Sequence, residues 1–199
     1  MKQFLHVGCA RLTKAHTTGG FNNDDWREVR FDIDPDYAPD IVGTIVDMSN
    51  VADGSFDAIF SSHNLEHVYP HEVQRVILEF ARVLTDDGFV VLTCPDLQSV
   101  CETVAQDKLL ETVYVSPLGP IAPIDILFGH RASVSAGKHY MAHKCGFTFS
   151  VLANLFVAGG FKSVYGGRRP QNFDLWIIAF RQPKTDPEMQ AFGLQHLPS

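Results

Sequence analysis

The sequence lacks the patterns that mark secreted, disulfide-stabilised or membrane-spanning proteins. Its four cysteines, Cys9, Cys94, Cys101 and Cys145, include no C-x-x-C pair among 199 residues. We therefore expect reduced thiols in a cytoplasmic protein. No apolar run approaches the roughly 20 residues of a membrane span, and the first residues lack the charged-then-apolar order of a signal peptide.

Basic charge is also scarce. With 16 Lys and Arg against 23 Asp and Glu, the formal net charge is −7 at pH 7, which predicts no nucleic acid partner. Apolar residues make up 45% and charged residues 20% of the chain, as in an ordinary globular protein. We expect one domain over residues 1–181, with an insertion at 114–146, followed by a loose polar tail over 182–199.

The segment Asp53–His67, DGSFDAIFSSHNLEH, is the most informative part of the chain. Its first three residues predict a turn. Phe56–Ser61 is too short for a helix and is typical of a strand buried on both faces. Polar residues follow, and a helix with one apolar side is predicted over Pro70–Leu84. A buried strand that ends in a polar loop before a helix is where open α/β sheets bind ligands.

Other apolar runs predict the remaining strands, at Gln3–Val7, Glu28–Phe31, Asp40–Val46, Phe89–Thr93, Lys162–Tyr165 and Phe173–Phe180. The last two are expected to pair as an antiparallel hairpin. Helices are predicted over Leu97–Val113, on the opposite face of the sheet, and over Ser150–Ala158. Arg11–Asp25 lacks helical periodicity and predicts a long loop. Because some linkers are too short for crossover helices, one face would be thinly covered, or covered by a second subunit in a homodimer.

Two of these segments resemble class I S-adenosylmethionine-dependent methyltransferases of the small bacterial type. DGSFDAIFSSHNLEHV resembles their fourth strand and following loop, and RVILEFARVLTDDGFVVLTCP, Arg75–Pro95, resembles the next helix and strand. The resemblance implies a Rossmann-like α/β fold, with a mostly parallel sheet and an antiparallel C-terminal hairpin. It also implies methyl transfer from S-adenosylmethionine to a small-molecule acceptor.

The same resemblance implies where the cofactor binds. Gly8, Cys9 and Ala10 stand in the turn after the first strand, where the family has a glycine-rich loop. Ala10 replaces the second usual glycine. Asp32, with Asp34 as the second candidate, stands where the family has the acid that binds the ribose hydroxyls. The residues alone allow another interpretation, in which both acids are solvated turn carboxylates before a proline.

Further pocket residues are expected after the third and fourth strands. Asp47 and the backbone N–H of Met48 are expected at the adenine, although Thr44 departs from the acid that relatives often carry. Ser62 and His63 are expected to line the pocket. The departures from the family pattern favour an alternative: a degenerate methyltransferase-fold protein that acts as a non-catalytic binding or scaffold module.

A general base is needed only where the acceptor must lose a proton, because the sulfonium already activates the methyl group. Imidazole titrates near neutrality. The candidate bases are therefore the histidines His63, His130, His139 and His143. Within the insertion, the apolar run Ile121–Phe128 and its polar neighbours predict part of the acceptor pocket, with Arg131 as a partner for an anionic group. A packed surface loop with scattered histidines is equally compatible with these residues.

His63-x-x-Glu66-His67 also matches the H-x-x-E-H zinc motif of one group of metallopeptidases. That motif requires a helix that places both imidazoles on one face. Here it follows a strand and lies three residues before Pro70. We therefore expect no metal, and we interpret Glu66 and His67 as residues that form hydrogen bonds within the loop.

Overall fold

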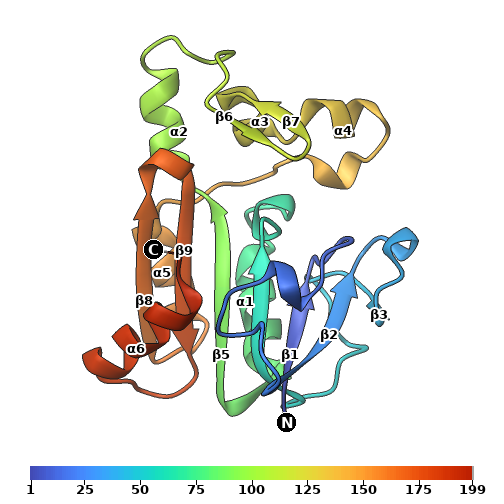
Figure 1. Ribbon diagram of the computed structural model, residues 1–199, viewed down its shortest axis with the longest axis vertical. Coiled ribbons are helices and arrows are strands. Elements are labelled where there is room, and N and C mark those ends of the chain that lie inside the picture. The colour runs from blue at the N-terminus through green and yellow to red at the C-terminus, as the bar shows by residue number, and fades with distance from the viewer. Residues whose placement is uncertain (199) are drawn as a thin grey trace.

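The protein forms one seven-stranded sheet in the computed structural model, which describes residues 1–198 (Figure 1). The strand order is β3-β2-β1-β4-β5-β9-β8. The parallel strands are β1 (Lys2–Val7), β2 (Trp26–Asp32), β3 (Ile41–Val42), β4 (Phe56–Ser62) and β5 (Leu84–Pro95). The antiparallel hairpin consists of β8 (Ser163–Arg169) and β9 (Asp174–Phe180). This architecture confirms the predicted Rossmann-like fold.

Four strands differ clearly in length from the prediction: β3 is shorter, and β2, β5 and β8 are longer. β3 spans only Ile41–Val42, because a tight turn follows in which the N–H of Asp47 donates to the carbonyl of Thr44 at 3.1 Å. β5 is longer than predicted and begins at Leu84, directly after the preceding helix. Residues 85–88 therefore belong to the strand, where the pairing between β4 and β5 shifts register, and do not form a separate helix-stopping turn.

One face of the sheet is covered by α1 (Val73–Val83) and α5 (Phe149–Ala158). α1 begins three residues later than predicted. The spacing of its apolar residues accounts for its packing, because Val76, Ile77 and Phe80 lie on one side of the helix and are fully buried. They join the larger of the two cores on the sheet, together with the inward-facing residues of β1, β4 and β5.

The other face is covered by the loop between β1 and β2 and by α6 (Asp186–His196). The predicted loop over 11–25 is confirmed apart from one 3-10 turn, η1 (Lys14–His16). Its Phe21 stacks on Phe4 with ring centroids 4.5 Å apart. Phe192 of α6 lies 5.1 Å from Phe89 and 5.0 Å from Phe180. These aromatic side chains cover the face that was expected to be thinly covered.

The prediction of a loose tail over 182–199 is wrong, because α6 occupies most of it. A capping box begins the helix, in which the backbone N–H of Thr185 donates to Glu188 Oε2 at 2.8 Å. Helix formation then brings Met189 and Phe192 onto the aromatic cluster. Burial of these side chains outweighs the polar character of the segment.

The predicted helix over 97–113 is also shorter than expected. α2 spans Leu97–Val104 and extends beyond the end of the sheet (Figure 1). It packs through Val100 against α3 (Pro123–Phe128) and not against a face of the sheet. The insertion continues with the hairpin β6 (Tyr114–Ser116) and β7 (Gly119–Ile121), then α4 (Arg131–Ser135) and η4 (His139–Met141).

The insertion lies above the carboxyl ends of the parallel strands (Figure 1). In an open α/β sheet, this edge is where ligands bind. No helix among residues 1–198 is both long and apolar enough to cross a membrane.

The docking of α6 predicts a specific dependence of stability on pH. His196 is 2% exposed, and its Nδ1 lies 2.9 Å from Thr18 Oγ1. Burial lowers the pKa of His196 from 6.5 to about 4. Between these values the unfolded chain binds the proton and the folded chain does not. The stability conferred by the neutral ring is therefore complete above pH 6.5 and is lost as the pH falls towards 4.

We expect His196→Gln to flatten the decline of the free energy of unfolding across this window, by up to about 1.4 kcal/mol per pH unit. Urea denaturation at several pH values measures this slope. The matched control is His71→Gln, because His71 is exposed. If both variants keep the wild-type slope, His196 is not buried in its neutral form.

Candidate active site

The candidate site begins at the turn after β1. Gly8 has a φ of +65°, and its N–H donates to the carbonyl of Phe31 at 2.9 Å. A Cβ at this position would lie 2.7 Å from Cγ of Asn64, in the loop after β4. The turn therefore passes so closely between β2 and this loop that only glycine fits. Gly8 lies in the turn after β1, as expected, beside the end of β2 and the loop after β4.

Ala10 adopts a left-handed backbone conformation, which a glycine at this position would adopt without strain. Its φ is 46°, and its N–H donates to Asp32 Oδ2 at 2.7 Å. The guanidinium of Arg30 holds the other side of the turn through the carbonyls of Leu12 and Ala10. Cys9, between the two turn residues, is fully buried, and this burial raises the pKa of its thiol to about 11. Asp32 and Arg30 thus hold the turn in this conformation with alanine at position 10.

Asp32 and Asp34 lie together at the end of β2. Asp32 is 6% exposed, and its second oxygen, Oδ1, accepts a hydrogen bond from the N–H of Asp34 at 2.9 Å. Asp34 in turn accepts from the Tyr140 hydroxyl at 2.6 Å and from the N–H of Asp36 at 3.0 Å. These hydrogen bonds, that of Tyr140 foremost, lower the pKa of Asp34. Tyr140 belongs to the insertion, so the insertion is tied to the end of β2.

The two groups expected to contact the adenine already have partners within the protein. Asp47 is half exposed and lies 3.8 Å from Arg75 in an ion pair. Met48 is fully buried, and its N–H donates to Glu79 Oε2 at 2.7 Å. The prediction that this N–H serves an adenine nitrogen is therefore wrong, because the hydrogen is already bonded within the protein.

Several buried polar atoms near the carboxyl ends of β4 and β5, and in the loop after β4, have no hydrogen-bond partner within the part of the chain that the structure describes. Five buried side-chain atoms have no hydrogen-bond partner among the described residues: Ser61 Oγ, Asn64 Nδ2, both carboxylate oxygens of Glu66, and Thr93 Oγ1. Buried polar atoms nearly always have a partner in a folded protein. Of these atoms, the two carboxylate oxygens of Glu66 belong to one side chain that is 1% exposed.

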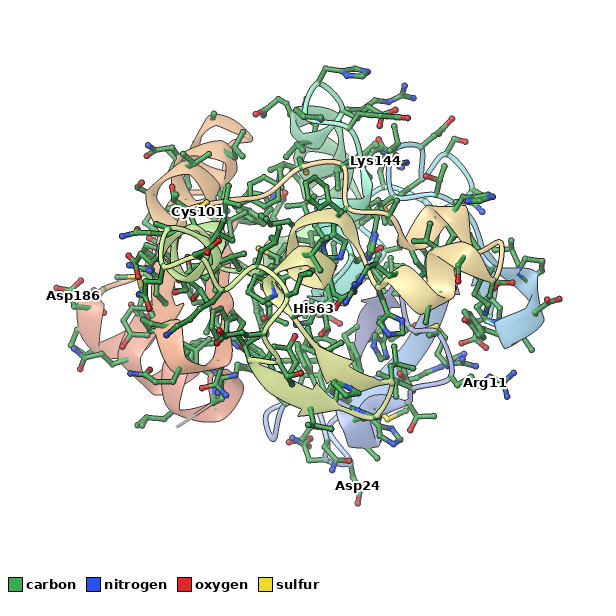
Figure 2. All side chains as sticks on the ribbon, turned by 90° about the horizontal axis from the view of Figure 1, so that it is seen from above. Arg11, Asp24, His63, Cys101, Lys144 and Asp186 are labelled. Atoms are coloured by element: carbon green, nitrogen blue, oxygen red, sulfur yellow. The ribbon has the colours of Figure 1, made fainter. Side chains whose placement is uncertain are left out.

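Two of the four candidate histidines flank Glu66. His63, which follows Ser62 at the end of β4, places Nδ1 3.4 Å from Glu66 Oε1, and His143 places Nε2 4.0 Å from the same oxygen. His63 lies near the centre of the view onto the carboxyl ends of the strands (Figure 2). His130 instead bonds Ser133 within the insertion, and His139 is exposed.

Glu66 is the residue whose role the sequence analysis missed. Its side chain is 1% exposed and makes none of the expected loop hydrogen bonds, whereas His67 does bond a loop carbonyl, that of Ala142. Burial alone would raise the pKa of Glu66, but the neighbouring imidazoles, His63 first, bring it below its usual value. The signal that pointed to this cluster was the H-x-x-E-H pattern.

A cavity of about 170 Å³ adjoins the cluster. Apolar side chains of α2 and α3, among them Leu97, Val100 and Ile126, line it together with His143. An apolar wall with a few polar groups is the usual composition of a small-molecule pocket. Arg131 is not free to serve this pocket as expected, because its Nε donates to Asp125 Oδ1 at 2.7 Å and this lowers the pKa of Asp125 to about 2.

Comparison with known proteins finds methyltransferases. A family model described as a methyltransferase domain matches residues 8–92, the segment that runs from the Gly8 turn into β5. No curated protein sequence matches the chain significantly.

Several solved structures have the same fold. An S-adenosylmethionine-dependent methyltransferase from Methanosarcina mazei is 18% identical, with a TM-score of 0.57 over 92% of this chain and 93% of that one. The 1,6-didemethyltoxoflavin-N1-methyltransferase of Burkholderia thailandensis, solved with its substrate and S-adenosylhomocysteine bound, is 14% identical, with a TM-score of 0.55 over 92% and 72%. A methyltransferase from Archaeoglobus fulgidus is 14% identical, with a TM-score of 0.56 over 90% and 86%.

The conformation of Ala10 predicts a stabilising substitution. We expect Ala10→Gly to raise the free energy of unfolding by about 0.5–1 kcal/mol, because glycine adopts a positive φ without strain. Denaturant unfolding measures the change. Ala132→Gly on exposed α4 is the control and should have the opposite effect, a loss of about 1 kcal/mol. A loss at both positions would mean that Ala10 is not strained.

Proposed function

We propose that this chain is a class I S-adenosylmethionine-dependent methyltransferase, which transfers a methyl group from S-adenosylmethionine to a small-molecule acceptor. One observation carries the proposal. The glycine turn after β1, the paired acids after β2 and the unpaired polar atoms after β4 and β5 all lie along the same edge of the sheet. This is the edge at which open α/β sheets bind ligands.

The donor half of this site fits the cofactor chemically. S-adenosylmethionine, when bound, supplies a methyl group that its sulfonium has already activated. In the proposal, the backbone from Gly8 to Ala10 contacts the methionine and ribose portions, because no Cβ at position 8 stands in the way. Asp32 uses only two of the roughly four acceptor positions of a carboxylate, so it retains capacity for ribose hydroxyls.

The protein's contribution to methyl transfer is then mainly positioning and exclusion of water. Among the four candidate histidines, His63 is proposed to approach the acceptor, because it follows the end of β4 and its side chain is half exposed. The scaffold alternative has less support, since Ala10 retains the conformation that a glycine would have.

The donor site is tested by calorimetry with S-adenosylhomocysteine. We expect wild-type protein to bind it and Asp32→Asn to weaken binding by about 1–3 kcal/mol, through loss of charge-assisted hydrogen bonds. Asp36→Asn is the matched control, because Asp36 is an exposed acid close by in the chain. Absence of binding by the wild type would refute the proposed function. Equal affinity in the folded Asp32→Asn variant would refute only the role of Asp32.

We further propose that residues 114–146 cover the donor site and shape the acceptor pocket. Three contacts tie this segment to the ligand edge. Tyr140 bonds Asp34, Lys138 Nζ donates to the Tyr37 hydroxyl at 2.9 Å, and the N–H of Lys144 donates to the carbonyl of Glu66 at 2.8 Å. Two of the partners follow β2 and the third follows β4, so the segment bridges the expected donor site.

Hydrogen exchange distinguishes a cover from a subunit interface. We expect amides of residues 131–145 to gain protection on addition of S-adenosylhomocysteine, with the oligomeric state unchanged. Size-exclusion chromatography at several protein concentrations provides the control. Protection that follows protein concentration and ignores the ligand would identify the segment as a homodimer interface instead.

A further inference from the structure

We propose that Glu66, His67 and His143 form a binding site for a divalent transition-metal cation. Each residue offers one ligand atom, and the three atoms lie within 4.8 Å of one another. Glu66 and His67 belong to the 3-10 turn η3 (Leu65–His67) after β4, and His143 to the segment that leads from the insertion into α5. The inference is independent of the proposed methyl transfer, because a cation can bind without the cofactor.

The unpaired carboxylate of Glu66 is the first reason. It is 1% exposed, and neither oxygen has a hydrogen-bond partner among residues 1–198. The ring nitrogens of His63 and His143 lie 3.4 and 4.0 Å from Oε1, close enough for an ion pair when protonated but without a hydrogen bond. A buried carboxylate is costly unless it is paired or bound to a metal. A cation between the three side chains would satisfy it.

The orientation of the two imidazoles is the second reason. Nδ1 of His67 lies 3.2 Å from the carbonyl oxygen of Ala142, and Nδ1 of His143 lies 2.7 Å from that of Ile126. A carbonyl oxygen can only accept, so each Nδ1 carries the hydrogen and each Nε2 has a free lone pair. Histidines that bind metals are held in this way, by a hydrogen bond from the ring nitrogen that faces away from the ion.

The backbone holds the two segments of the site together. The carbonyl of Glu66 accepts hydrogen bonds from the N–H groups of Lys144 and Cys145, at 2.8 and 3.3 Å. The residues that follow His143 are thus fixed to the turn that carries Glu66 and His67. The ligands are therefore in place before any ion binds, which limits the ordering that binding requires.

This geometry also answers the sequence argument against a metal. That argument assumed that H-x-x-E-H binds zinc from one helix. Here the turn η3 supplies an adjacent Glu66 and His67, and the third ligand comes from a distant part of the chain. His63, the first histidine of the motif, is half exposed beside Glu66 and is not among the three ligands.

The ligand set selects the class of ion. Two imidazole nitrogens and one carboxylate oxygen suit Zn²⁺, Fe²⁺ or Co²⁺, whereas Mg²⁺ and Ca²⁺ prefer oxygen ligands throughout. Three protein ligands leave a coordination position open, as in catalytic zinc sites. A cation here would lie beside the cavity that His143 lines.

The test uses untagged, chelator-stripped protein and Zn²⁺ or Co²⁺ as probe. We expect metal analysis after dialysis to find about one zinc per chain, as for a single site with three protein ligands. Co²⁺ should give the visible absorption bands of a site with nitrogen and oxygen ligands. Glu66→Gln and His143→Ala should each weaken binding by more than the roughly 10–100-fold that outer-shell changes cause. His71→Ala and His139→Ala, both at exposed positions, should bind as the wild type does.

Glu66→Gln also separates loss of the site from loss of the fold. In the presence of chelator its melting temperature should equal or exceed that of the wild type, because the substitution removes a buried unpaired charge. Added Zn²⁺ should raise the melting temperature of the wild type and not that of the variant. Two results would overturn the proposal. One is much less than one zinc per chain in the wild type. The other is the same zinc content in all variants, which would indicate binding to surface histidines. S-adenosylhomocysteine calorimetry without metal tests the proposed function separately.

Discussion

The donor half of the site depends on one carboxylate. Asp32 accepts hydrogen bonds from the N–H of Ala10 and from the N–H of Asp34, and so fixes the turn after β1 against the turn after β2. This contact compensates for two features that are absent from the chain, a glycine at position 10 and a helix after β1. Arg30 reinforces the same turn through backbone carbonyls. A single buried acid and one arginine thus hold the turn after β1.

The other half of the site is organised around Glu66. β4 ends in two serines, and the insertion lies above the carboxyl ends of β4 and β5 (Figure 1). His63 and His143 approach Glu66 from these two directions, and neither bonds it. In the two proposals, the methyl donor lies at the Asp32 half of the site and a cation lies at the Glu66 half.

The sequence predicted the parts of the structure that depend on local pattern. The apolar run of β4, the helix α1 and the terminal hairpin follow from periodicity, and the place of Gly8 and Asp32 follows from a resemblance to a family. The parts that failed depend on distant contacts. α6 needs Phe21 and Phe89 to make its burial favourable, and these lie far away in the chain. The N–H of Met48 is used by Glu79, and Glu66 meets His143 across the insertion, pairings that no spacing rule contains.

The most direct test of the account is a crystal structure of the protein with S-adenosylhomocysteine. The account predicts that the ligand lies across the carboxyl ends of β1, β2 and β4. Its ribose would lie against Asp32, its amino acid part along the Gly8 turn, and its sulfur would face the Glu66 cluster. A ligand bound elsewhere, or a ribose without any contact to the end of β2, would contradict the account.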